Sequence, residues 1–163
     1  MNLMDSNPPS LRAPTAAERL FNRVFGYLVG LGLGFSHHYL LQVPGRKSGR
    51  IYSTPIDLLE LEGKRFLVAP RGRTQWVRNA EAAEVVTLKK GRTRQSFRLH
   101  PIPDAEKPEI VKAYLDTFRR EVQRYFPVPA GSPAAAFLEL AENYPVFELL
   151  PLFLTGPAET LWE

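Results

Sequence analysis

Apolar and polar residues alternate along two runs that flank a short polar turn. The first run covers residues 39–44, the second covers 51–61, and the turn between them covers 45–49. Alternation with a period of two residues, interrupted by a glycine-containing turn, predicts a β-hairpin. A tight turn at 62–64 leads into a further apolar run over 65–69. We therefore expect these three strands to follow one another as a meander.

Three further strands are predicted nearer the C-terminus. Residues 84–88 and 93–102 lie on either side of a Lys-Lys-Gly turn, and residues 145–150 form the last apolar run. Turn residues bound each of these runs, which is typical of strands.

Helical spacing precedes and interrupts the strands. Thr15 and Glu18 form a capping-box pattern, so a helix is expected to begin there. Thr74 is placed to cap a short helix that has Trp76, Val77 and Ala80 on one face.

Two more helices are predicted between the fifth and the last strand. Pro108 suits the first turn of a helix whose apolar residues recur every three or four positions as far as Tyr125. Ser132 and Pro133 begin another helix, which we expect to continue through Ala141.

The order of these elements favours an α+β, mainly β protein. Strands that connect through hairpins argue for an antiparallel sheet or barrel with helices packed outside, and against a parallel sheet. We expect a flexible leader at 1–14, one domain over 15–151 that includes the N-terminal helix, and a C-terminal tail at 152–163.

The stretch before the first strand is apolar but carries four glycines between residues 24 and 35. It is shorter than the roughly 20 residues that a membrane span requires. Three interpretations of 16–36 remain open, namely a helix packed on the domain, a helix on a membrane surface, or an export signal. We expect a cytoplasmic protein, membrane-associated if the second interpretation holds.

Composition limits the chemistry. The 163 residues are 44% hydrophobic and 23% charged, as in a soluble globular protein, and none is cysteine, which excludes disulfides and thiolate chemistry. The net charge is +4, yet residues 46–78 hold eight bases and three acids. This local excess favours an anionic ligand.

The turn at 45–49 concentrates that charge. Gly45 and Gly49 free the backbone to present successive amides as an anion-binding concavity, while Arg46, Lys47 and Ser48 add side-chain donors. We expect the turn to bind a phosphate. The alternative interpretation is an ordinary polar turn without a ligand.

Other candidate sites are weaker. His37, His38 and His100 have no carboxylate at metal-ligand spacing, so we expect no metal site. Nucleic-acid binding is disfavoured because no recognised module or aromatic stacking surface accompanies the basic residues.

Four segments together resemble the deazaflavin-dependent nitroreductase family. They are Gly-Arg-Lys-Ser-Gly at 45–49, Ser-Thr-Pro at 53–55, Leu-Val-Ala-Pro at 67–70 and Trp-Val-Arg-Asn at 76–79. The resemblance spans roughly residues 20–150. It implies a split β-barrel of the FMN-binding type, in the flavin/deazaflavin oxidoreductase superfamily, that binds coenzyme F-420.

The resemblance also implies which residues bind the cofactor. The turn at 45–49 would receive the phosphate and acidic tail, other residues would border the ring, and two would line or brace the pocket. The full set is Gly45, Arg46, Lys47, Ser48, Gly49, Ser53, Thr54, Pro55, Ala69, Pro70, Arg71, Gly72, Trp76 and Asn79. Relatives commonly carry Pro and Arg where Ile51 and Tyr52 stand, so FMN stays open as the alternative cofactor.

The expected activity is transfer of hydride from the reduced cofactor to a small-molecule acceptor, either a quinone, a nitro compound or an activated alkene. The cofactor carries that chemistry, which explains the lack of a catalytic triad. Tyr52 and Tyr125 are the candidates for donating a proton to a substrate oxygen. The alternatives are an FMN-dependent reductase and a non-catalytic carrier of a cofactor, fatty acid or haem. Either a monomer or a homodimer is compatible with the sequence.

Overall fold

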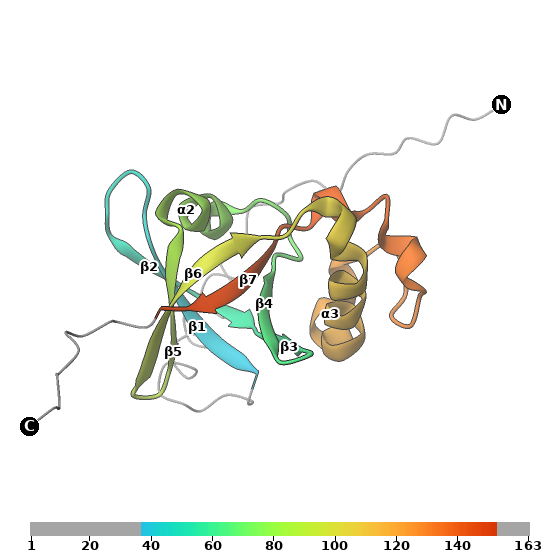
Figure 1. Ribbon diagram of the computed structural model, residues 1–163, viewed down its shortest axis with the longest axis horizontal. Helices are drawn as coiled ribbons and strands as arrows, with labels where there is room; N and C mark the ends of the chain where they lie inside the picture. Colours follow the sequence, from blue (N-terminus) through green and yellow to red (C-terminus); the bar gives the residue numbers. More distant parts are fainter. Residues whose placement is uncertain (1–36, 153–163) are drawn as a thin grey trace, which may run out of the picture.

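A computed structural model describes residues 37–152 of the chain (Figure 1). The expected leader, N-terminal helix and glycine-rich stretch lie outside the described residues, as does the tail beyond Leu152. The strands in the described part are β1 (His38–Pro44), β2 (Ile51–Asp57), β3 (Leu59–Leu61), β4 (Lys64–Val68), β5 (Val85–Lys90), β6 (Thr93–Pro101) and β7 (Val146–Pro151). The helices are α2 (Gln75–Ala83) and α3 (Lys107–Val122), with short 3₁₀ turns η1 (Asp104–Glu106), η2 (Gln123–Tyr125), η3 (Ala134–Phe137) and η4 (Ala141–Asn143).

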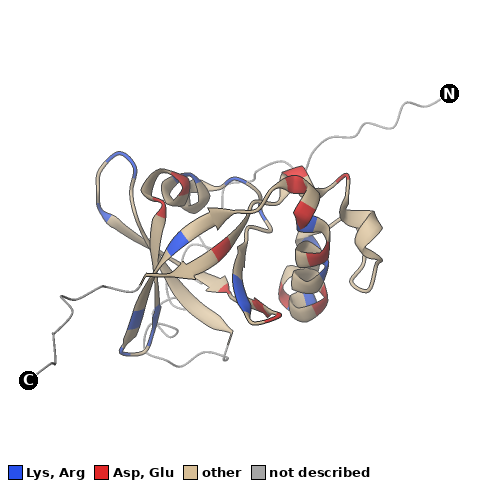
Figure 2. Ribbon diagram, viewed as in Figure 1, with Lys and Arg blue, Asp and Glu red and all other residues tan. Residues whose placement is uncertain are grey.

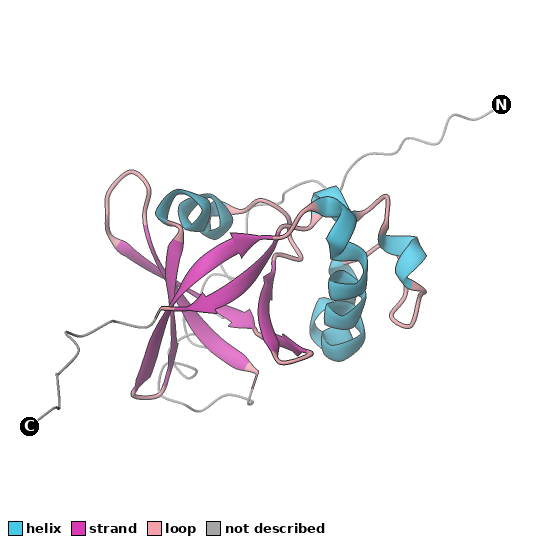
Figure 3. Ribbon diagram, viewed as in Figure 1, coloured by secondary structure: helices cyan, strands magenta, loops and turns pink. Residues whose placement is uncertain are grey.

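All seven described strands form one sheet in the order β2-β1-β5-β6-β7-β4-β3, and every neighbouring pair is antiparallel. The two edge strands, β2 and β3, are separated in sequence by Leu58 alone. Six strand spacings of ~4.8 Å make a flat sheet about 29 Å wide, whereas one residue spans at most ~3.6 Å. The sheet must therefore curl until its edges meet at Leu58, and Figure 3 shows this curvature. The fold is a split β-barrel, as predicted.

The predicted meander is wrong. The second run does not continue as one strand to Leu61, because β2 ends at Asp57 and β3 begins at Leu59 on the opposite edge. There β3 pairs with β4, and β4 pairs in turn with β7 near the C-terminus. Alternation along a sequence indicates that a segment is extended, but it does not identify the partner strand.

The core has two parts that share strands. One apolar cluster fills the barrel, and a second packs between the sheet and α3. Along β4, Leu67 joins the first cluster while Phe66 and Val68 join the second, and Phe147 and Val146 divide in the same way on β7. Since successive side chains on a strand point to opposite faces, β4 and β7 form a layer that is buried on both sides.

Helices α2 and α3 confirm two predictions, and the segment from Ser132 contradicts a third. Pro108 lies in the first turn of α3, as expected, and η2 extends the helical segment to Tyr125. The helix expected from Ser132 through Ala141 is wrong, because only the 3₁₀ turns η3 and η4 form there. Phe137 is fully buried while Leu138 beside it is largely exposed.

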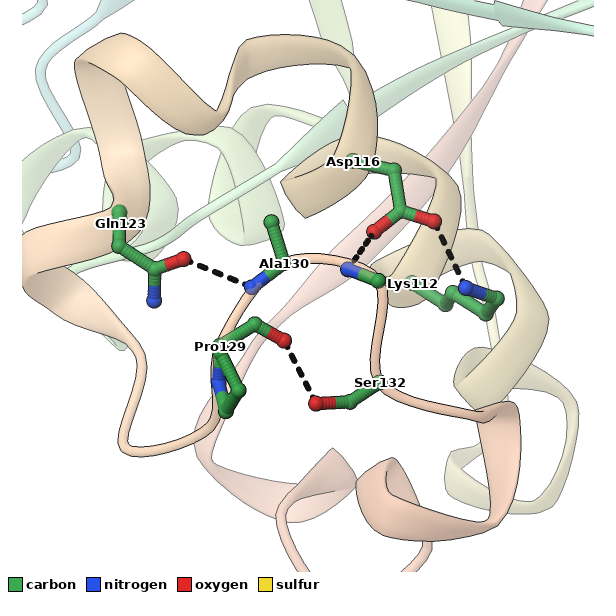
Figure 4. A network of polar contacts seen from close by, with 7 residues as sticks. Lys112, Asp116, Gln123, Pro129, Ala130 and Ser132 are labelled. Atoms are coloured by element: carbon green, nitrogen blue, oxygen red, sulfur yellow. Dashed lines mark hydrogen bonds and ion pairs between the residues drawn. The ribbon is translucent and has the colours of Figure 1, made fainter.

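Side chains of α3 and η2 hold the following loop (Figure 4). Gln123 Nε2 donates to the Val128 carbonyl at 2.8 Å, and its Oε1 accepts from the Ala130 amide at 2.7 Å. Asp116 accepts from the Gly131 amide and from Lys112 Nζ, both at 2.7 Å. These bonds return the chain across α3 toward η3 and β7.

No helix in the described part of the chain has the length and apolar character that crossing a bilayer requires.

Candidate cofactor site

The turn between β1 and β2 is closed by its own amides. Gly45 N donates to the Arg50 carbonyl at 2.7 Å, and Gly49 N donates to the Gly45 carbonyl at 2.9 Å. Arg50 N donates to Ser48 Oγ at 3.2 Å, and Gly49 adopts the left-handed conformation with φ of 71°. Arg46 N donates to Asn79 Oδ1 at 3.2 Å. The amides of Gly45, Arg46 and Gly49 are therefore already paired, so the expected concavity of free amides is wrong for these three residues, and side chains must supply part of the donors for an anion.

Arg46 joins the turn to α2. Its Nη1 donates to Asn79 Oδ1 at 2.7 Å and to Gln75 Oε1 at 2.9 Å. Gln75 and Asn79 are four residues apart on α2, so they lie on the same face of the helix. Asn79 is only 6% exposed, which fixes its acceptor in place. Within residues 37–152, Nη1 is the only guanidinium nitrogen of Arg46 with a hydrogen bond, so Nε and Nη2 can bind an anion.

The rest of the turn presents cationic and hydroxyl groups to solvent. Lys47 and Arg50 are exposed and form no ion pair with any described residue. Ser48 Oγ accepts from the Arg50 amide, which leaves its own proton free to donate. Figure 2 shows this positive charge at the tip of the loop between β1 and β2, beside α2. The donor set matches a phosphate or carboxylate.

Tyr52 lies against the base of the turn. A Cβ atom added at Gly45 would come within 2.6 Å of Tyr52 Cε2, so the glycine is needed for the ring to approach the backbone. Tyr52 pairs with Val43 across the β1–β2 ladder and is 52% exposed. Of the two candidate tyrosines, Tyr52 is therefore the one beside the cationic turn.

Tyr125 lies in a different part of the molecule. Its side chain packs on the α3 cluster, its carbonyl accepts from Tyr144 Oη at 2.8 Å, and Arg124 lies over its ring. None of the described contacts connects Tyr125 to the turn or to α2.

The loop before α2 supplies the second predicted segment. Ala69 N donates to the Pro145 carbonyl at 2.9 Å, and Gly72 N, with φ of 78°, donates to the Ala69 carbonyl at 3.1 Å. Pro70 and Arg71 are half-buried between them. Thr74 holds the N-cap position but its side chain makes no capping bond, which corrects the predicted cap. The loop nevertheless leads directly into α2 and so toward Arg46.

The remaining predicted residues flank these segments. Trp76 on α2 is half-buried against the barrel cluster, with its ring centroid 6.4 Å from that of Phe147. Ser53, Thr54 and Pro55 follow Tyr52 along β2 opposite Gln42, Leu41 and Leu40. The structure joins the turn to α2 by hydrogen bonds and to Ser53–Pro55 by the continuous strand.

Sequence reasoning missed Gln75, which shares Arg46 with Asn79. Polar residues in the first turn of a helix are common, and Arg46 is 29 residues away in sequence, so no local signal identified Gln75.

Sequence reasoning also missed a cluster of side chains at the other end of the β1–β2 ladder. His37 and His38 lie together with Asp57, although no carboxylate is near them in sequence. Burial raises the pKa of Asp57 to about 6, with a further contribution from the Glu121 carboxylate. Burial also lowers the pKa of both histidines.

The described part of the chain is a curled antiparallel barrel whose cationic turn is held against α2 by Arg46. This arrangement is that of a barrel protein with a site for an anionic group. Residues 16–125 match the family model described as F420H(2)-dependent quinone reductase. This match covers more than half of the 163 residues, so the chain belongs to that family. Membership confirms the predicted deazaflavin-dependent reductase and coenzyme F-420 as its cofactor.

Two solved structures with a TM-score of 0.50 agree on the fold. A protein from Agrobacterium tumefaciens, Atu2129, is 22% identical with a TM-score of 0.50, over 89% of this chain and 59% of that one. This chain thus spans less than two thirds of that protein. A structure described as a domain-swapped dimer is 19% identical with a TM-score of 0.50, over 82% and 92% of the two chains. An F420-H2 dependent reductase, FDR-A, is 20% identical with a TM-score of 0.47, over 70% and 94%. No curated protein matches the sequence.

Proposed function

We propose that this protein delivers hydride from reduced F-420 to a quinone, and that the turn at 45–49 together with Arg50 anchors the acidic tail of the cofactor. The observation that carries the proposal is the position of Arg46. Its guanidinium is held against α2 by Gln75 and Asn79, while Lys47, Ser48 and Arg50 provide donors around it. A guanidinium fixed before the ligand arrives loses less side-chain entropy on binding than a mobile one.

The other predicted residues have roles that follow from their positions. Ser53, Thr54 and Pro55 on β2, the loop from Ala69 to Gly72, and Trp76 on α2 would border the ring of the cofactor. Trp76 offers a flat apolar surface that the barrel core supports from behind. These elements would orient the ring and keep water away from it.

The bound cofactor supplies hydride, and the protein must position the acceptor and provide a proton. Reduction of a quinone requires a proton at the oxygen as well as a hydride. Tyr52 carries a phenol proton at Oη beside the turn, and we assign it the donor role. Its half-exposed position allows exchange of that proton with solvent.

The anchor is tested by titrating the full chain with F-420 and following fluorescence quenching. We expect the double variant R46A/K47A to bind F-420 more weakly by about 3–6 kcal/mol, the sum of two charge-assisted contacts. R92A/R94A is the matched control, because it removes the same charge from exposed positions on β6 and its turn and should bind normally. Equal affinity of R46A/K47A and wild type would overturn the assignment, and preferential binding of FMN would favour the flavin alternative.

The acceptor is tested by steady-state reduction of menadione, a nitroimidazole and an activated enone under identical conditions. We expect the quinone to be reduced most efficiently. Tight cofactor retention without turnover of any acceptor would instead indicate a carrier protein.

We also propose that residues 15–151 form a single domain and that the protein is cytoplasmic. Size-exclusion chromatography with light scattering decides between monomer and homodimer.

A further inference from the structure

Three potential ligand atoms converge where the β1–β2 ladder begins. His38 Nε2 lies 2.9 Å from Asp57 Oδ1, and His37 Nε2 lies 3.6 Å from the same oxygen. One ligand atom from each of the three residues lies within 4.8 Å of the other two. The separation from His37 is too long for a hydrogen bond. Its imidazole therefore faces the carboxylate across a gap that a third group can bridge.

The backbone holds these residues in place. His38 and Asp57 are direct partners in the antiparallel ladder, and the Leu58 amide donates to the His37 carbonyl at 2.9 Å. Adjacent residues on a strand normally point to opposite faces. His37 instead precedes β1 in a turn, which allows both imidazoles to reach one carboxylate.

Packing against α3 completes the surroundings. The His37 ring centroid lies 4.8 Å from that of Phe118 and 4.2 Å from that of His38. The side chains of His38, Asp57 and His37 are 7%, 16% and 29% exposed. Glu121 on α3 and Lys90 on β5 act on the pKa of both histidines in opposite directions. The Asp57 carboxylate oxygen lies 2.9 Å from the His38 nitrogen and 3.6 Å from the His37 nitrogen.

We infer that His37, His38 and Asp57 form a binding site for a divalent transition-metal ion of the zinc class. Two imidazole nitrogens and one carboxylate oxygen are a donor set that suits Zn²⁺, Co²⁺ or Fe²⁺ and does not suit Ca²⁺ or Mg²⁺. Bonds of about 2.0 Å at tetrahedral angles place ligand atoms roughly 3.3 Å apart. The observed separations of 2.9 and 3.6 Å lie on either side of that value. Water would complete the coordination, and the ion would fasten the start of β1 to the end of β2.

The test uses the full chain after dialysis against a chelator. Co²⁺ is added while visible absorption is recorded, and Zn²⁺ is then added as competitor. We expect cobalt bands that Zn²⁺ abolishes, and a thermal unfolding midpoint that rises with Zn²⁺. The variant H37Q changes the most exposed of the three side chains and should lower the affinity for Co²⁺ at least tenfold. D57N provides a second variant with the same expectation.

H100Q is the matched control, since His100 is exposed on β6 and lies outside the cluster. It should keep the wild-type affinity for Co²⁺. The inference is overturned if wild type shows no cobalt bands, if H37Q and D57N bind Co²⁺ as wild type does, or if H100Q loses affinity equally. Circular dichroism of each variant establishes that it is folded before its affinity is compared.

Discussion

Asn79 is the residue on which the geometry of the candidate site depends. Its Oδ1 accepts from both the backbone amide and the guanidinium of Arg46, and the side chain is buried. One acceptor thus fixes the turn and its charge relative to α2. A buried acceptor that serves two donors leaves both unsatisfied when it is removed.

We therefore expect Asn79→Ala to lower the free energy of unfolding by about 1–3 kcal/mol and to weaken F-420 binding, although Asn79 carries no charge. Asn79→Asp is the companion variant: it keeps an acceptor for both donors of Arg46, so its stability should fall less, but its negative charge beside the guanidinium opposes the anionic tail, so its affinity for F-420 should fall as well. Urea unfolding and fluorescence titration measure the two effects. Wild-type affinity in Asn79→Ala would show that the position of Arg46 does not depend on this bond.

Tyr144 gives the protein a sensitivity to alkaline pH. Its hydroxyl is buried and donates to the Tyr125 carbonyl, and burial raises its pKa from 10.0 to about 12. The folded state holds this proton more tightly than the unfolded state does. The resulting stability is complete below pH 10 and is lost as the pH rises toward 12.

The expected loss across that interval is about 2 kcal/mol from this residue. In Tyr144→Phe that part of the pH dependence should disappear, while stability at pH 7 should fall by about 1 kcal/mol because the Tyr125 carbonyl loses its donor. Burial also raises the pKa of Tyr114, so some alkaline sensitivity should remain in the variant. Urea unfolding at pH 7 and pH 11.5 measures both changes, and parallel pH profiles for the two proteins would contradict the prediction.

At the level of elements, the loop after α3 is ordered by side chains rather than by a regular structure. Gln123 satisfies both the Val128 carbonyl and the Ala130 amide. Removing it as Gln123→Ala should cost about 1–3 kcal/mol and speed hydrogen exchange at the Ala130 amide. Lys112→Ala is the control, because its partly exposed i,i+4 pair with Asp116 contributes only about 0.3–0.5 kcal/mol. Unchanged exchange at Ala130 in Gln123→Ala would mean that other contacts hold the loop.

The elements also show which parts of the fold local sequence can specify. Alternation predicted the strands of the described part except for the division of 51–61 into β2 and β3, and Pro108 predicted the start of α3. The jump of the chain at Leu58 from one sheet edge to the other was not predictable, since Leu58 and Leu59 are both buried leucines in one apolar run. Their separation depends on which strands they pair with, and β4 and β7 are distant in sequence.

In the candidate site, too, some features could be predicted from local sequence and others could not. Its charged turn was evident from two glycines, two bases and a hydroxyl in five residues. The pairing of the Arg46 amide was not, because its acceptor Asn79 lies 33 residues beyond Arg46. The cluster of His37, His38 and Asp57 likewise has no signature in sequence, since strand register places His38 opposite Asp57 and the turn before β1 brings in His37.

At the scale of the whole molecule, the shared layer couples the two apolar clusters. Strands β4 and β7 give side chains to both the barrel interior and the α3 interface, so neither cluster can be exposed without disturbing the strands that support the other. We therefore expect one cooperative unfolding transition for the described part of the chain. Phe137→Ala in the α3 cluster should lower the free energy of unfolding by about 3–5 kcal/mol, and unfolding should still occur in a single transition.

The two sides of the layer can be followed separately in one experiment. In a Trp162→Phe background, Trp76 is the only tryptophan and reports on the barrel cluster, while far-ultraviolet circular dichroism at 222 nm is dominated by the helices. The urea midpoints from the two signals should coincide in this background, and should shift together when Phe137→Ala is added. If the substitution on the α3 side moves only the dichroism midpoint, then β4 and β7 do not transmit stability between the clusters, and the barrel with its cationic turn is an independent folding unit.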